Sequence, residues 1–134
     1  ATLYDGGAGG GVSFRGGLFY GNDSLEITNT TISGNLVAGS GGGLAAYRGD
    51  SFLLRNSTIS DNETRSSGGG ADISHFLNAT ILNSTISGNR ADFAGGGLTL
   101  YNDGPESWLI YNSTITGNTA GTLAGGIGVA GYYY

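Results

Sequence analysis

The acidic residues are the first candidate catalytic groups, because two carboxylates held close together can serve as general acid and general base in hydrolysis. Only Asp61 and Glu63 stand close to one another in the sequence, on either side of an asparagine. No aspartate pair recurs along the chain, and lysine is absent. We therefore expect no catalytic residues. The ten acids are Asp5, Asp23, Glu26, Asp50, Asp61, Glu63, Asp72, Asp92, Asp103 and Glu106.

His75 is the single histidine, in the sequence ISHF. Histidine is a common general base and metal ligand, but both roles need partner groups. The chain has no cysteine and no second histidine, which excludes a disulfide framework and a thiolate metal site. We therefore predict a solvated turn residue at His75, with no metal ion and no cofactor bound by the chain.

Composition narrows the classes of partner. The chain has 134 residues and a formal net charge of -5, so it offers no basic surface for a nucleic acid. No apolar run approaches the roughly 20 residues of a membrane span, so we expect no membrane insertion. Glycine contributes 28 residues, but 38% hydrophobic and 10% aromatic content argue for a packed core rather than a disordered chain.

A heptad with the pattern NSTISGN is repeated four times and points to a solenoid. Its isoleucines are Ile32, Ile59, Ile86 and Ile115, at spacings of 27, 27 and 29 residues. A glycine-rich triplet ends 11 residues after each of them, at Gly43, Gly70, Gly97 and Gly126, and Gly9 to Gly11 form a further triplet. The path from the end of a triplet to the next heptad isoleucine varies from 16 to 21 residues, so we expect insertions in loops on one side of the solenoid.

Within each repeat the apolar residues alternate, which predicts strands. Strands this short, repeated at this period, pair in parallel with the next repeat and align equivalent positions into columns. We predict an all-β parallel β-helix with three short strands per turn and about four complete turns of 27–32 residues. It forms one open-ended domain over residues 1–134. The core consists of five columns. One column contains the heptad isoleucines, and the other four are Ile27, Leu54, Ile81, Ile110; Leu25, Phe52, Ala79, Trp108; Val12, Leu44, Ala71, Leu98, Ile127; and Phe14, Ala46, Ile73, Leu100, Val129.

Asparagine begins and ends each heptad, and both positions fall at corners between strands. A corner needs a left-handed backbone, which asparagine tolerates better than any residue except glycine. Stacked asparagine side chains can also hydrogen-bond from turn to turn. We predict one ladder of Asn29, Asn56, Asn83 and Asn112, and a second of Asn35, Asn62, Asn89 and Asn118.

These units, NSTISGN followed by GGGL, resemble the right-handed parallel β-helix repeats of large bacterial surface and secreted proteins, over about residues 5–131. The resemblance implies a right-handed helix, secretion or display at the cell surface, and a role as an adhesin stalk or autotransporter-like passenger domain. The same fold also carries polysaccharide lyases and hydrolases, so a polysaccharide-binding or polysaccharide-degrading domain is the alternative.

Asn-x-Ser/Thr sequons are frequent and make glycans candidate partners of the surface. Five of them lie at heptad corners, at Asn29, Asn56, Asn62, Asn83 and Asn112. We expect those five to be masked inside the wall. Asn22 and Asn78 lie in the variable path and are the candidate glycosylation sites.

The residues that flank each heptad isoleucine should point outward as two rows of hydroxyls, suited to ligand binding or O-glycosylation. Such an array resembles the Thr-x-Thr face of ice-binding β-helices, so ice binding is a second alternative. Serine replaces threonine in three of the four second positions and removes methyl groups that such a face uses. The rows are Thr31, Thr58, Thr85, Thr114 and Ser33, Ser60, Ser87, Thr116.

A further outer face is predicted to be apolar, which suits burial against another chain. Two tyrosines should also point outward from the strand that follows the glycine triplet. The predicted lateral or ligand contacts are Leu53, Leu82, Leu109 and Tyr111 on the first face, and Tyr47 and Tyr101 on the second.

Neither end of the sequence has the pattern of a cap, and both ends stop at the same phase of the repeat. Open ends predict pairing with more β-helix, either as a head-to-tail homopolymer or as the remainder of a longer β-helix. We therefore predict a structural, non-enzymatic subunit of an extracellular filament or cell-surface adhesin, whose partner is another copy of itself or the remainder of a longer β-helix.

Overall fold

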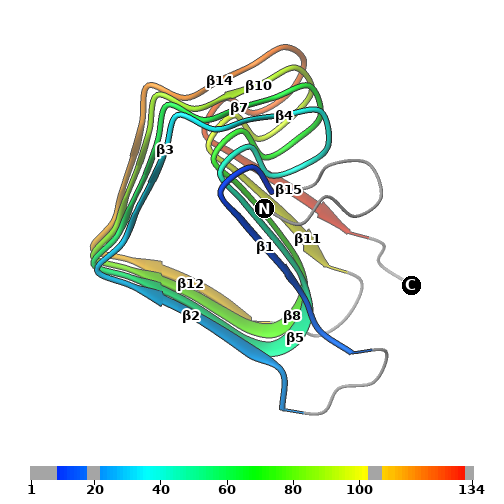
Figure 1. Cartoon of the computed structure of the whole chain (residues 1–134), viewed down its shortest axis with the longest axis vertical. Helices are drawn as coiled ribbons and strands as arrows, with labels where there is room; N and C mark the ends of the chain where they lie inside the picture. Colours follow the sequence, from blue (N-terminus) through cyan, green and yellow to red (C-terminus); the bar gives the residue numbers. More distant parts are fainter. Residues whose placement is uncertain (1–8, 18–21, 103–106, 132–134) are drawn as a thin grey trace.

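The chain forms a parallel β-solenoid in a computed structural model that describes residues 9–17, 22–102 and 107–131. Within these described ranges, fifteen strands, β1 to β15, wind around one axis and pair in parallel into three sheets (Figure 1). No helix is found among the described residues. The predicted all-β parallel β-helix of about four turns is confirmed.

The largest sheet contains the strands that follow the glycine triplets. Its strand order is β1-β5-β8-β11-β15, with β2 paired to β5 and β12 paired to β8. The bounds are β1 Val12–Arg15, β2 Ser24–Thr28, β5 Leu44–Arg55, β8 Ala71–Leu82, β11 Leu98–Asn102, β12 Ser107–Tyr111 and β15 Ile127–Gly131.

Two four-stranded sheets complete each turn. The second sheet carries the heptad isoleucines, in the order β13-β9-β6-β3, and the third contains two-residue strands, in the order β14-β10-β7-β4. The bounds are β3 Thr31–Ser33, β6 Thr58–Ser60, β9 Thr85–Ser87, β13 Thr114–Thr116, β4 Leu36–Val37, β7 Glu63–Thr64, β10 Arg90–Ala91 and β14 Thr119–Ala120.

The inner turns have the predicted three strands each, but the long strand of the largest sheet bends, so each turn has four sides (Figure 1). The bend lies at Arg48 in β5 and at His75 in β8, where φ is +63° and +59°. A left-handed residue turns the chain without breaking the strand, and the sequence pattern carries no signal for it. We call the parts of the sheet before and after the bend its first and second limbs. The two longest connections from a glycine triplet to the next heptad, where insertions were expected, include residues 18–21 and 103–106, which lie outside the described residues.

The register confirms the predicted core columns. Leu44 pairs with Ala71, which pairs with Leu98, and Ile59 pairs with Ile86. All of these side chains are buried. Phe76 was not among the predicted core residues, but it is buried at the bend against Phe14 and Phe52, with ring centroids 6.0 and 5.8 Å away. Its ring fits because its strand partner is Gly49, where a Cβ would lie 2.5 Å from the ring.

The glycine triplets form the corner before the first limb, as predicted. The first residue of each triplet is left-handed, with φ of +72° at Gly68, and the alanine that replaces glycine at position 124 takes φ of +51°. The middle residue has a different constraint. A Cβ on Gly69 would lie 2.3 Å from the carbonyl oxygen of Gly96, so the next turn leaves no space for a side chain.

Candidate functional site

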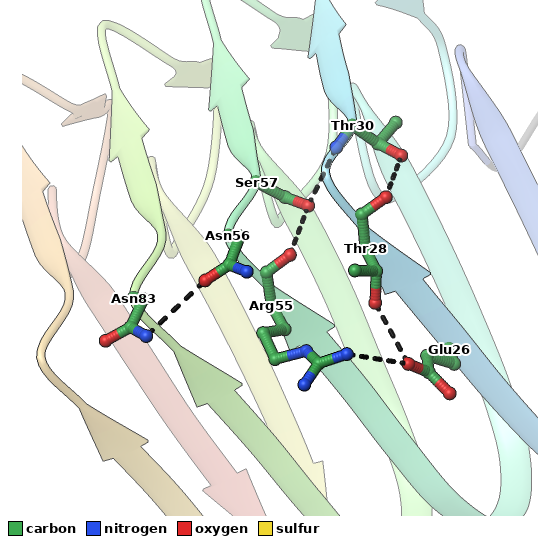
Figure 2. Close-up of polar contacts among 7 residues, drawn as sticks. All are labelled: Glu26, Thr28, Thr30, Arg55, Asn56, Ser57 and Asn83. Carbon is green, nitrogen blue, oxygen red and sulfur yellow. Dashed lines mark hydrogen bonds and ion pairs between the residues drawn. The ribbon is translucent and has the colours of Figure 1, made fainter.

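The first heptad asparagines occupy the predicted left-handed corner, with φ of +53°, +50°, +49° and +47° at Asn29, Asn56, Asn83 and Asn112. Their side chains form only a partial ladder. One hydrogen bond joins two of them, from Asn83 Nδ2 to Asn56 Oδ1 at 3.4 Å (Figure 2). All four residues are exposed. The prediction that these sequons are masked inside the wall is therefore wrong for them, because the left-handed turn directs the side chain outward.

The second heptad asparagines form the continuous ladder. The side-chain oxygen of Asn89 accepts hydrogen bonds from the backbone nitrogen and Nδ2 of Asn62, both at 3.0 Å. Its Nδ2 donates to the Ile59 carbonyl at 2.9 Å and to Asn118 Oδ1 at 3.0 Å. Asn62 repeats the pattern with Asn35. Asn62 and Asn89 are buried, with exposed fractions of 1% and 0%, so only the sequon at Asn62 is masked as predicted.

A serine ladder beside the first corner was not predicted. The hydroxyl of Ser57 accepts a hydrogen bond from the backbone nitrogen of Thr30 and donates to the Arg55 carbonyl (Figure 2). In the same way, the Ser84 hydroxyl accepts a hydrogen bond from the backbone nitrogen of Ser57 and donates to the Leu82 carbonyl. The Ser113 hydroxyl accepts from the backbone nitrogen of Ser84 and donates to the Tyr111 carbonyl. The signal was present in the sequence, because a hydroxyl follows the first asparagine in every heptad. The two ladders satisfy backbone groups at the corners that strand pairing leaves open.

The hydroxyl rows align as predicted on the outer face of the second sheet. Thr31, Thr58, Thr85 and Thr114 are register partners, as are Ser33, Ser60, Ser87 and Thr116. The rows are exposed on the first and last turns and half-buried on the two turns between them. Their use for ice, ligands or O-linked sugars stays a prediction.

The apolar outer face is smaller than predicted. Leu109 and Tyr111 are exposed by 56% and 58%, but Leu53 and Leu82 are half-buried. The difference arises because β5 and β8 each have paired strands on both sides, whereas β12 pairs with β8 alone among the described strands. The candidate glycosylation sites Asn22 and Asn78 are both exposed.

A groove of about 480 Å³ lies on the outer face of the first limb and is a candidate binding site. Its floor follows the register column Ser13, Ala45 and Asp72, in which the short side chain of Ala45 leaves a depression. The neighbouring column contributes Arg15, Tyr47, Ser74 and Tyr101 to the wall, and Ser40 and His75 complete the site.

Three aromatic rings pack edge-on or tilted against one another along one wall of the groove. The His75 ring lies between Tyr47 and Tyr101, with centroid distances of 5.0 Å to each and interplanar angles of 75° and 58°. His75 is therefore not a solvated turn residue without partners, and that prediction is wrong. Its left-handed backbone breaks the alternation of the strand and allows it to join the tyrosines on the outer face. Both predicted outward tyrosines are half-buried by these contacts.

Two arginines lie over the same aromatic wall. The guanidinium carbons of Arg15 and Arg48 are 5.5 and 5.2 Å from the centroid of the Tyr47 ring, within the range of a cation–π contact. Neither makes an ion pair with another described residue. In contrast, Arg55 pairs with Glu26, and Arg90 pairs with Glu63 and Asp92. Arg15 lines the groove and Arg48 lies beside it, so two guanidiniums without an acidic partner among the described residues flank the Tyr47 ring.

Asp72 is the acid of the groove. Burial raises the pKa of its carboxyl above the ordinary value, and hydrogen bonds from Ser74 (2.6 Å) and Ser40 and the charge of His75 offset part of that rise. Its carboxylate is part of the groove floor, where it can accept a hydrogen bond from a bound hydroxyl.

The raised pKa of Asp72 predicts how the free energy of unfolding depends on pH. The folded chain holds this proton more tightly than the unfolded chain, so its contribution is complete below the ordinary aspartate pKa, about 3.9, and is lost as the pH rises through the raised value. We expect Asp72→Asn, which keeps the acceptor for Ser74, to be more stable than the unmodified chain at pH 7. The gain should vanish near pH 3 in urea titrations. An equal gain at both pH values would contradict the assignment.

The described residues contain no group of three His, Cys, Asp or Glu placed to hold a metal ion. Nor do they form a helix of the length and apolar character needed to span a membrane.

Comparison with known proteins agrees with the geometry. A family model described as a right-handed β-helix region matches residues 7–132. No curated protein and no solved structure matches the chain significantly. The family match covers nearly the whole chain, and the parallel sheets and turn-by-turn register are those of that fold. The chain belongs to the right-handed β-helix family.

Proposed function

We propose that the chain is a structural, non-enzymatic subunit of an extracellular filament or surface adhesin, in which β-helix turns of separate copies stack end to end. The observation that carries this proposal is the uncovered core at the β15 end. The extracellular location is supported by the resemblance of the repeats to bacterial surface proteins.

The core columns continue into β15 but are open there. Ile127 and Val129 are exposed by 36% and 65%, although Leu98 and Leu100, their register partners in β11, are exposed by 0% and 4%. β15 has no strand partner other than β11 among the described residues. An apolar layer with an open strand edge is stabilised by another strand of the same pattern.

The strand β1 of a second copy has that pattern. It occupies the first limb, as β15 does, and forms the opposite edge of the same sheet. Continued register would place Val12 of the second copy over Ile127 and Phe14 over Val129. β15 is the one described strand of a fifth layer, while β12, β13 and β14 belong to the fourth layer. At the joint these three strands would therefore be separated from the second copy by a gap of about one layer, or 4.8 Å. We therefore expect weak association that depends on concentration.

We expect Val129→Glu to weaken this association about tenfold, because the joint would bury a carboxylate without a partner. The single chain should keep its stability, since Val129 is already exposed. Sedimentation velocity over a concentration series measures the association.

The matched control is Ala130→Glu, which adds the same charge to the neighbouring residue on the outer face of β15. In the continued register its column brings Arg15 of the second copy close, so the control should associate at least as well as the unmodified chain. Equal loss in the two variants would point to net charge rather than to the open core.

A further inference from the structure

The four asparagines that begin the heptads differ in how firmly the next turn holds their corners. At the first three corners, the backbone nitrogen of the following residue donates to a hydroxyl of the serine ladder. Ser57 donates to Ser84 and Ser84 to Ser113, both at 3.2 Å, and Thr30 donates to Ser57 at 3.1 Å (Figure 2). The backbone nitrogen of the asparagine itself donates to a carbonyl of the next turn, at 3.1 Å in all three cases. Each of these corners is therefore held by two hydrogen bonds from its backbone.

The fourth corner lacks both bonds. The backbone nitrogens of Asn112 and Ser113 have no hydrogen-bond partner among the described residues, because β12 has no described strand on its open side. Ser57 and Ser84 are buried, with exposed fractions of 5% and 3%, whereas Ser113 is half-buried. The backbone angle φ does not distinguish the corners, since it lies between +47° and +53° at all four asparagines. What differs is the anchoring of the peptide bond between Asn112 and Ser113.

This peptide bond has the groups for a spontaneous modification. The backbone nitrogen of a residue that follows asparagine can give up its proton and bond to the side-chain amide carbon, which expels ammonia and closes a succinimide ring. Water then opens the ring to aspartate or isoaspartate, so water is the only other reactant. The nitrogen must first leave any hydrogen bond that it makes and rotate with its peptide plane toward the side chain. A hydrogen bond to the next turn opposes that rotation.

We propose that Asn112 is a site of spontaneous deamidation, and that the serine ladder protects the equivalent asparagines of the preceding turns. Conversion replaces the Asn112 amide with a carboxylate, so a modified copy gains one negative charge at the corner between β12 and β13. The reaction is independent of end-to-end stacking, because it takes place within one copy.

The test is to incubate the full chain at mildly alkaline pH and to follow deamidation over time by mass spectrometry after cleavage at arginine. The four corners then fall in four separate peptides, residues 16–48, 56–65, 66–90 and 91–134, and fragment spectra assign each mass gain to one asparagine. Asn56, Asn83 and Asn112 share the sequence NST, so their rates can be compared directly. We expect Asn112 to convert about tenfold faster than the other two in the folded chain. In concentrated urea, where the ladder is absent, all three should convert at similar rates.

Ser84→Ala tests the cause of the protection. It removes the hydroxyl that accepts from the Ser57 nitrogen, so the rate at Asn56 should rise about fivefold while the rate at Asn112 stays the same. The matched control is Ser87→Ala in β9 of the same turn, because the Ser87 hydroxyl makes no hydrogen bond with another described residue. This control should change neither rate. Circular dichroism verifies that each variant is folded.

Three results would overturn the proposal. The first is equal conversion of Asn56, Asn83 and Asn112 in the folded chain. The second is a preference for Asn112 that persists in urea, which would trace it to the flanking sequence rather than to the ladder. The third is an unchanged rate at Asn56 in folded Ser84→Ala, which would show that the ladder hydroxyl does not protect that corner.

Discussion

Asn89→Ala is expected to lower the free energy of unfolding by about 4 kcal/mol, a large share of the total for a domain of this size. The substitution removes the acceptor for two donors of Asn62 and the donor for the Ile59 carbonyl and Asn118. Because the site is fully buried, water cannot replace these partners without opening the wall. Urea unfolding followed by circular dichroism measures the loss.

The matched control is Asn83→Gly at the first corner of the same turn. Asn83 is exposed and left-handed, and its one side-chain hydrogen bond is 3.4 Å long. Glycine adopts that backbone conformation freely, so we expect a change of about 0.5 kcal/mol or less. If the two variants lost similar amounts, the side-chain ladder would not be what asparagine supplies at position 89.

Gly69→Ala is expected to cost about 3 kcal/mol by overpacking between turns. The new Cβ would lie 2.3 Å from the Gly96 carbonyl oxygen and 2.6 Å from the carbonyl of Arg90, so backbone rather than a flexible side chain would have to move. The equivalent glycines of adjacent turns are equally close, which leaves the stack little room to relax. Thermal and urea unfolding both report the change.

Gly34→Ala separates steric overlap from backbone strain. Gly34 has φ of +67°, but a methyl group added at this corner would have no other atom within 4 Å. Alanine there should cost only the left-handed penalty, about 1 kcal/mol. A loss at Gly34 as large as the loss at Gly69 would contradict the role assigned to close packing between turns.

Much of the fold follows from the sequence because one repeat determines all the others. Period-two alternation placed Leu44, Ala71 and Leu98 in one column, and parallel pairing at a fixed repeat then required the observed register. The left-handed corner at the first asparagine followed from residue type alone. Local pattern and stacking point to the same structure, so these features could be predicted.

The choice between the two asparagine ladders could not be made from residue type. Both asparagines end a strand in every heptad, but only the second points inward, where it replaces lost strand hydrogen bonds. Whether a corner side chain turns in or out depends on the backbone angle at that corner, and no periodicity encodes that angle.

The groove was missed for a related reason. Tyr47 and Tyr101 were predicted to face outward, and they lie two turns apart in one register column, with Ser74 between them. His75 is the residue after Ser74, so it belongs to the next column. Strict alternation would place consecutive residues on opposite faces. The left-handed backbone at Arg48 and His75 suspends that alternation and brings both residues onto the tyrosine wall.

The most direct test of the structural proposal is electron microscopy of the purified chain at neutral pH over a concentration series. The proposal predicts unbranched rods of constant width that lengthen as concentration rises, with a layer spacing of about 4.8 Å along the axis. Short rods of one length at every concentration would contradict end-to-end stacking between copies.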